Sequence, residues 1–190
     1  MGNSFKRLWT GTVRLCGWHY LEPDADVSRH LDRCVIIMAP HTAIADFLLG
    51  AGYLWKLGVN CRILIKKEFF RWPLGNLLKR FGAIPVDRGN PRDGMIERSL
   101  AGFRDNERFT LVITPEGTRK KVTRWKRGFY EIATKAGVPV LLSFIDYKNK
   151  TMGFKGLFMP TGNYDADIKE IKNNYRDAAP KHPEGWQTID

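Results

Sequence analysis

Residues 34–46, CVIIMAPHTAIAD, decide the fold of this chain. The stretch begins with an apolar run that is rich in β-branched residues, and such a run predicts a buried strand. Pro40 ends the run, His41 follows at once, and Asp46 lies five residues further on, inside a new apolar segment. A histidine at the end of a buried strand, with a carboxylate about one helical turn away, is a candidate site for proton transfer.

The spacing between His41 and Asp46 limits how the two side chains can meet. On one continuous helix, residues i and i+5 are about 140° apart, so their side chains do not contact each other well. If the helix instead starts near Thr42, His41 stays in the loop and the carboxylate can point back at the imidazole. It would then fix the tautomer and stabilise the imidazolium, leaving the other nitrogen free to take a proton. The alternative is a structural loop histidine followed by a helix-start acid.

Outward from this stretch, apolar runs alternate with amphipathic segments. The runs predict strands over 61–65, 82–88, 109–113, 138–145 and 150–159. The segments between them predict helices over 43–57, 72–81, 92–105, 128–136 and 165–177. The helix over 128–136 is expected to end at Gly137 as its C-cap. Strands that alternate with helices predict a single α/β domain with a largely parallel or mixed sheet flanked by helices.

The N-terminal residues have a different pattern. A helical projection of residues 4–18 places apolar and aromatic side chains, Phe5 and Trp9 among them, on one side and basic side chains on the other. This pattern is typical of a helix at a membrane interface, or of an ordinary helix packed on its own domain. Residues 20–33 look like a polar connection. We therefore expect an amphipathic, membrane-contacting segment and linker over 1–33, and the main domain over 34–190.

Composition narrows the class of partner and the compartment. The 190 residues carry a net charge of +11, which favours an anionic partner such as nucleic acid, anionic lipid, a phosphorylated metabolite or an acidic carrier protein. The three cysteines have spacings that match neither a zinc site nor a disulfide framework, so a reducing, cytoplasmic compartment is expected. The sequence shows no signal peptide and no apolar run near 18 residues.

Polar residues follow several of the predicted strands. In open parallel sheets, ligand sites lie beyond the carboxyl ends of the strands, so we expect these residues to face one cleft. The residues in such positions are His41, Lys66, Lys67, Arg88, Glu116 and Arg119.

Four short motifs now become recognisable. They are the H-x4-D stretch from His41 to Asp46, GAIPVDR at 82–88, PEGTR at 115–119 and AGVPV at 136–140. In this order, over roughly residues 34–145, they resemble the motifs of the glycerolipid acyltransferases, most closely the 1-acylglycerol-3-phosphate O-acyltransferase group. The H-x4-D spacing alone is a weak signal, whereas all four motifs in order are specific.

The resemblance implies a catalytic pair. His41 would be the general base that removes a proton from the acceptor hydroxyl, and Asp46 would orient it and balance its charge. The hydroxyl would attack an acyl thioester directly, with no acyl-enzyme. A thioester is already activated, so no metal or cofactor is expected, and the co-substrate would be acyl-CoA or acyl-loaded acyl carrier protein.

The resemblance also implies substrate contacts. Arg88 would bind the acceptor phosphate, with Lys66 or Lys67 helping, because a guanidinium fork binds two oxygens at once. Glu116 would position the glycerol part of the acceptor and Gly117 would allow close approach. The remaining residues of that loop would hold it and add phosphate contacts, namely Thr118 and Arg119.

Two positions depart from the family pattern. Ala43 stands where serine is common, and Thr114 stands where an aromatic residue is common, so acceptor or acyl-chain preference is open.

The expected location is peripheral, on the inner face of the cell membrane, in contact with anionic lipid.

Three alternatives remain. The same chemistry could act on another lyso-lipid such as a lyso-aminolipid. The basic-aromatic run at 124–127 could belong to a nucleic-acid-binding domain, but no recognised module stands out, so no nucleic acid is expected. A non-catalytic lipid-binding relative would have no need of the His41–Asp46 pair.

Overall fold

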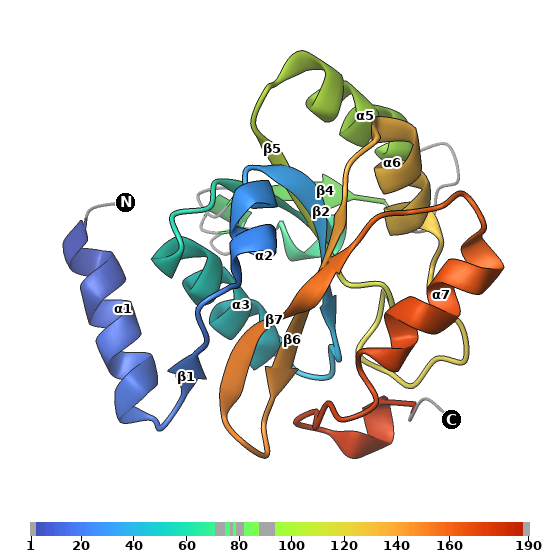
Figure 1. Cartoon of the computed structure of the whole chain (residues 1–190). Coiled ribbons are helices and arrows are strands. Elements are labelled where there is room, and N and C mark those ends of the chain that lie inside the picture. Colours follow the sequence, from blue (N-terminus) through green and yellow to red (C-terminus); the bar gives the residue numbers. More distant parts are fainter. Residues whose placement is uncertain (1–2, 71–74, 77, 79–81, 88–93, 188–190) are drawn as a thin grey trace.

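One mixed sheet organises the fold (Figure 1). The computed structural model describes residues 3–70, 75–76, 78, 82–87 and 94–187, with the side chains of residues 3–7 outside the description. The described strands lie in the order β1-β7-β6-β2-β5-β3-β4, and neighbours run parallel except for the β6–β7 pair. Their bounds are β1 His19–Tyr20, β2 Arg33–Ala39, β3 Cys61–Lys66, β4 Ala83–Val86, β5 Phe109–Ile113, β6 Val140–Asp146 and β7 Thr151–Phe158.

Helices cover both faces of this sheet (Figure 1). The helices α1, α2 and α3 pack on one face, and α5, α6 and α7 pack on the other. Their bounds are α1 Asn3–Leu15, α2 Ala25–His30, α3 Ile44–Lys56, α5 Met95–Asp105, α6 Gly128–Ala136 and α7 Tyr164–Asn173, with short 3-10 turns η1 Lys67–Phe69 and η2 Pro183–Gly185.

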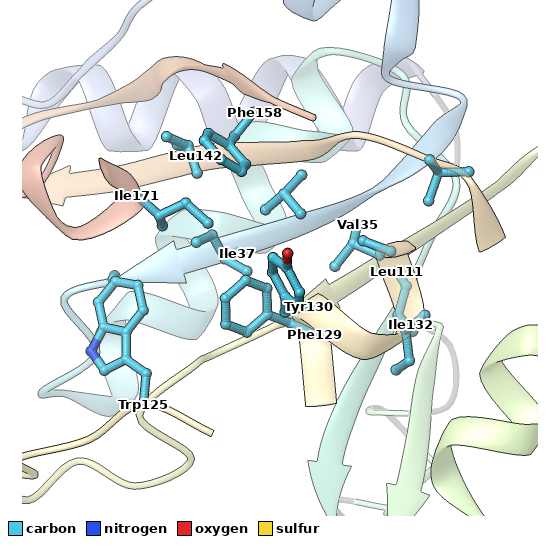
Figure 2. Close-up of a cluster of buried hydrophobic side chains, with 14 of the residues drawn as sticks. Val35, Ile37, Leu111, Trp125, Phe129, Tyr130, Ile132, Leu142, Phe158 and Ile171 are labelled. Atoms are coloured by element: carbon cyan, nitrogen blue, oxygen red, sulfur yellow. The ribbon is translucent and has the colours of Figure 1, made fainter. Parts of the chain in front are cut away.

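Strand β2 lies at the centre because it is apolar on both sides. Successive side chains of a strand point to opposite faces, so a strand covered on both faces needs an unbroken apolar run. Residues 34–39 supply that run, and none of them is more than 5% exposed. Val35 and Ile37 pack in the cluster with Phe129 and Ile171 (Figure 2), whereas Ile36 packs on the opposite face.

Most of the predicted elements are confirmed, and the difference lies before β2. Residues 20–33, expected to be a polar connection, contain part of β1 and the six-residue helix α2. The backbone N–H of Val27 donates to the Asp24 side chain, which caps α2, and the Val27 side chain is fully buried beneath the sheet. A helix this short shows too few periodic positions to be found in sequence. The predicted helix over 72–81 lies largely outside the described residues.

Helix α1 packs on its own domain, one of the two roles considered for it, and its contact with a membrane stays a prediction. Its Val13 is buried against the domain and its Trp9 ring contacts Trp55 of α3. Leu8 and Leu15 remain 68% and 91% exposed. No helix within the described part of the chain is both long and apolar enough to cross a bilayer.

Candidate active site

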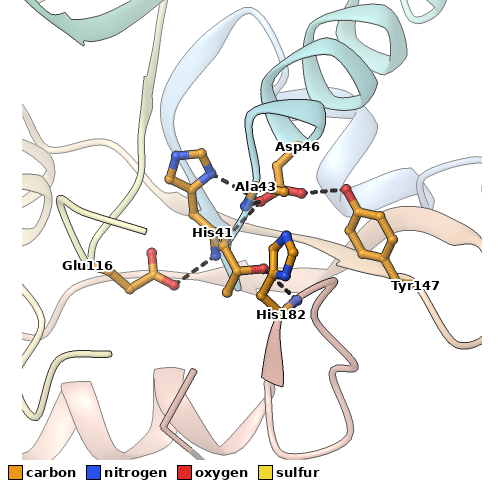
Figure 3. Close-up of polar contacts among 7 residues, drawn as sticks. His41, Ala43, Asp46, Glu116, Tyr147 and His182 are labelled. Atoms are coloured by element: carbon orange, nitrogen blue, oxygen red, sulfur yellow. Dashed lines mark hydrogen bonds and ion pairs between the residues drawn. The ribbon is translucent and has the colours of Figure 1, made fainter. Parts of the chain in front are cut away.

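Three neighbouring parallel strands bring the candidate site together. Strands β6, β2 and β5 lie side by side and run in the same direction, so the loops after them meet at one edge of the sheet. His41 follows β2, Glu116 follows β5 and Tyr147 follows β6. Figure 3 shows these side chains converging on the start of α3.

The first turn of α3 explains the spacing of the H-x4-D motif. Ala43 is the N-cap residue in an extended conformation, and Asp46 is the third residue of the helix. The Asp46 Oδ2 atom accepts hydrogen bonds from the backbone N–H groups of Thr42 and Ala43, both at 2.8 Å. His41 therefore lies in the loop before the helix, as predicted, and Asp46 points back toward it.

The His41 imidazole faces this carboxylate. Its Nδ1 atom lies 3.3 Å from Oδ2 of Asp46, a contact that falls short of hydrogen-bond geometry. The His41 side chain keeps 19% exposure, whereas that of Asp46 keeps 1%. With Nδ1 turned to the carboxylate, Nε2 is the nitrogen available to a substrate proton.

Asp46 is ionised despite its burial. Burial alone would raise its pKa, but the neighbouring His41 and the hydrogen bonds from Tyr147 and the Ala43 N–H outweigh burial and hold the pKa below its usual value. A buried carboxylate in this state stabilises an imidazolium next to it. The pair can therefore accept a proton at His41 and balance the charge that results.

Glu116 is the second buried acid of the site. It sits in a tight turn that is closed by a hydrogen bond from the Gly117 N–H to the Thr114 carbonyl at 3.1 Å, with Gly117 at φ +68°. Its Oε1 accepts from the His41 backbone N–H at 3.0 Å. Its Oε2 is buried and makes no hydrogen bond within the described residues. Burial raises the pKa of Glu116 to about 7, and its Oε2 atom is a buried polar atom without a partner in the described residues, in the loop cluster of His41.

The rest of the PEGTR turn is more open. A side chain at position 117 would bring its Cβ within 2.8 Å of the Lys126 side chain, so the close approach that glycine allows there is with Lys126. The hydroxyl of Thr118 accepts from the Lys120 N–H at 3.3 Å. Arg119 is exposed. Their predicted phosphate contacts stay predictions.

The lysines predicted to help with phosphate lie at the same sheet edge, beyond β5. Lys66 ends β3 and its ammonium group is 3.2 Å from Glu68, and Lys67 forms an ion pair with Asp87. Neither shows a contact with His41. Arg88, the predicted phosphate ligand, lies outside the described residues, one position after Asp87.

The structure adds residues that the sequence did not single out. The Tyr147 hydroxyl donates to Asp46 Oδ1 at 2.6 Å. The His182 N–H donates to the Thr42 hydroxyl at 3.3 Å, which brings the C-terminal segment beside the loop of His41 (Figure 3). Tyr147 follows a predicted strand, so the rule that selected Glu116 could have selected it. The segment around His182 carries no such signal.

The polar side chains of this site, His41, Asp46 and Glu116, are suited to proton transfer and hydrogen bonding. In the ranges that the structure describes, no three His, Cys, Asp or Glu side chains are grouped as a metal site requires. A histidine with a carboxylate behind it is suited to taking a proton from a hydroxyl, and a second acid with an unpartnered oxygen is suited to a further hydrogen bond.

Comparison with known proteins identifies the class to which this fold and site belong. Residues 22–142, more than half of the chain, match the family model described as Acyltransferase. The chain belongs to this acyltransferase family. The matched region contains His41, Asp46 and Glu116.

Individual relatives carry the name of one member of the family. The chain is 30% identical over 113 residues to a 1-acyl-sn-glycerol-3-phosphate acyltransferase of Cocos nucifera, covering 56% of this chain and 35% of that protein. It is 32% identical over 114 residues to one of Bacillus subtilis (strain 168), covering 58% and 54%. The chain thus spans about a third and about half of the lengths of these relatives.

A solved structure shares the fold. The 1-acyl-sn-glycerophosphate (LPA) acyltransferase PlsC from Thermotoga maritima matches with a TM-score of 0.64 and 17% identity, over 90% of this chain and 74% of that one. At this identity the match supports the α/β architecture of a seven-stranded mixed sheet between helices.

Proposed function

We propose that this protein transfers a fatty acyl group from an acyl thioester to the hydroxyl of lysophosphatidic acid, giving phosphatidic acid for phospholipid biosynthesis. The observation that carries the proposal is the His41–Asp46 pair, in which His41 Nδ1 lies 3.3 Å from Asp46 Oδ2. The Oε2 atom of Glu116, which has no hydrogen-bond partner in the described residues, belongs to the same loop cluster. The relatives named for this reaction support it.

The proposed step needs a single base. The acceptor oxygen attacks the thioester carbonyl while His41 Nε2 takes the hydroxyl proton, because an alcohol is a poor nucleophile until a base removes that proton. A carbon–oxygen bond forms, the carbon–sulfur bond breaks, and the proton leaves with the thiolate as a thiol. Asp46 stabilises the imidazolium in between. Glu116 Oε2 accepts a hydrogen bond from a second hydroxyl of the acceptor.

An anionic donor fits the surface beside the site. The nine-residue run 119–127 directly follows the Glu116 turn and contains six cationic residues, all exposed. Of these, Arg127 pairs with Asp165. Such a surface attracts the phosphates of CoA or the acidic surface of acyl carrier protein. Arg88, with Lys66 or Lys67, would bind the acceptor phosphate.

A peripheral position on the inner face of the cell membrane suits a lipid acceptor. The exposed Leu8 and Leu15 of α1, and Ile44 and Leu48 at 65% and 46% exposure on α3, are apolar groups on the helices of one sheet face. Shallow insertion of apolar side chains and attraction of basic residues to anionic lipid hold such proteins at a bilayer.

Thiol release tests the proposal. Purified protein is mixed with acyl-CoA or, separately, acyl-loaded acyl carrier protein, and with lysophosphatidic acid or other lyso-lipids, including a lyso-aminolipid. His41→Ala is compared with His30→Ala, which changes an exposed histidine on α2.

We expect thiol release that depends on lysophosphatidic acid, is lost in His41→Ala and is kept in His30→Ala. Thiol release with a lyso-aminolipid but not with lysophosphatidic acid would show that the lyso-aminolipid is the acceptor. Full activity of His41→Ala, or no release with any acceptor, would contradict the proposed reaction.

A further inference from the structure

Tyr147 contacts the carboxylate of the catalytic pair from the side opposite His41 (Figure 3). Its hydroxyl donates to Oδ1 of Asp46 at 2.6 Å, a short bond as expected for a charged acceptor. The other oxygen, Oδ2, serves the two backbone N–H groups of the α3 cap and faces His41. Tyr147 is the residue within the described chain that binds Oδ1.

The two oxygens of the Asp46 carboxylate bind different partners, and these bonds together fix the plane of the carboxylate. The Asp46 carboxylate turns about its Cβ–Cγ bond, a torsion with broad preferences, and any such turn moves both oxygens away from their partners. The cap N–H groups at Oδ2 and the Tyr147 hydroxyl at Oδ1 therefore oppose this rotation together, and the bond at Oδ1 adds to the restraint that the cap supplies. The His41 contact at 3.3 Å depends on this orientation, because it is not itself a well-formed hydrogen bond.

Tyr147 is in turn held by segments close to both ends of the described chain. Its ring packs edge to face against Trp18, which follows α1, with 4.9 Å between ring centroids and 89° between planes. Its backbone N–H donates to the carbonyl of Ala179 at 2.8 Å. The partly buried hydroxyl keeps its proton, because burial and the Asp46 charge raise the pKa of Tyr147 above its usual value.

We propose that Tyr147 is a positioning residue that orients Asp46 toward His41, and that Trp18 positions Tyr147. This inference rests on the proposed function, in which His41 is the base. It assigns the residues before the core domain a part in aligning the site, through the contact of Trp18 with Tyr147. Neither residue needs to touch substrate for this role.

Removal of the hydroxyl is the direct test. Tyr147→Phe keeps the ring and its contact with Trp18, and we expect kcat to fall about tenfold, as for loss of a hydrogen bond to a charged group. KM for the acceptor should change less than twofold. Tyr130→Phe is the matched control, since the Tyr130 hydroxyl also donates to a carboxylate at 2.6 Å, that of Asp167, and not to His41, Asp46 or Glu116, and it should keep the wild-type kcat.

The mode of action is tested with Asp46→Ala, which removes the acceptor of the Tyr147 bond. In that background, Tyr147→Phe should cause no further loss, since interacting residues are non-additive. Trp18→Ala should lower kcat in the same way, and Trp18→Phe should restore it by supplying another aromatic edge. Thermal unfolding of each variant shows whether it is folded.

A second readout does not depend on turnover. In protein with 15N-labelled histidine, the His41 signals are assigned by comparison with His41→Ala, and the Nδ1–H tautomer should dominate in the wild type and decrease in Tyr147→Phe. The inference would be overturned if Tyr147→Phe kept a kcat within twofold of wild type, or if it left the His41 tautomer unchanged. It would also be overturned if Tyr147→Phe lowered kcat as much in the Asp46→Ala background as in the wild type. If the wild type transfers no acyl group, the proposed function fails, while the tautomer still tests the positioning.

Discussion

The Oε1 atom of Glu116 accepts a hydrogen bond from the backbone N–H of His41 at 3.0 Å, across two neighbouring strand ends. This bond ties the turn after β5 to the loop that carries the proposed base. It also leaves the Glu116 carboxyl buried, at 4% exposure, with Oε2 vacant.

Burial of Glu116 makes stability depend on pH. Its pKa rises from an ordinary value of 4.5 to about 7 on folding, so between these values the folded protein holds a proton that the unfolded chain releases. The free energy of unfolding should therefore decrease as pH rises from about 4.5 to about 7, by about 3 kcal/mol from this group. Glu116→Gln should lack this decrease, measured by denaturant unfolding at several pH values.

The control for this prediction is Glu170→Gln, which changes an exposed carboxylate on α7. Its pH profile of unfolding should match that of the wild type. A Glu116→Gln profile with the same slope as wild type would show that Glu116 is ionised in the folded protein throughout this range.

The N-cap of α3 lacks a side-chain hydrogen bond. Ala43 is the N-cap residue, and the N–H of Asp46 reaches its backbone carbonyl at 3.3 Å, with no side-chain oxygen to accept. Ala43→Ser supplies that oxygen and should raise the free energy of unfolding by about 1 kcal/mol. Thermal unfolding measures this gain in stability, and the expected rise in Tm is about 2–4 °C.

Ala43→Cys is the matched control, because its sulfur resembles the serine oxygen in position but is a weak acceptor. It should give little of the gain. Equal gains in both variants would assign the effect to packing, and a lower Tm for Ala43→Ser would show that the site has no space for the hydroxyl.

The three cysteines should differ sharply in reactivity. Cys34 and Cys61 are buried, and burial raises the pKa of their thiols to about 12 and about 11, which suppresses the reactive thiolate. Cys16 is exposed after α1. A thiol-reactive disulfide reagent should therefore modify one thiol in the native protein and three after unfolding.

Replacement of the exposed thiol checks this assignment. Cys16→Ser should leave the native protein almost unreactive. Rapid reaction of two or more thiols in the folded wild type would contradict the burial of Cys34 and Cys61.

Exposed leucines on α1 should contribute to membrane attachment. Leu8 and Leu15 are two helical turns apart and share a face. A double change, Leu8→Glu with Leu15→Glu, removes apolar area and adds negative charge, so binding to vesicles containing anionic phospholipid should decrease at least tenfold in co-sedimentation.

The control places one glutamate on another exposed apolar residue, Met159, which follows β7 and is 54% exposed. Met159→Glu should bind vesicles nearly as the wild type does. Unchanged binding of the leucine variant would remove α1 from the proposed membrane contact.

Local sequence was sufficient for the central elements and for the placement of His41 and Asp46. The apolar run of residues 34–39 predicts a strand covered on both faces, because no polar position interrupts it. The spacing from His41 to Asp46 predicts a loop histidine and a helix-start acid, because capping geometry is local to one turn. The motifs also indicated the family.

Tertiary structure alone decided what surrounds that pair. Tyr147 is 101 positions from Asp46, and His182 is 140 positions from Thr42, so no local pattern predicts either contact. The Tyr147 contact follows from strand order, since β6 lies next to β2 and the loops after these two strands meet beside His41. The sequence by itself determined the elements and the chemical groups of this protein, whereas the order of the strands decided which of those groups touch, because side chains from distant strands become neighbours only when the sheet is assembled.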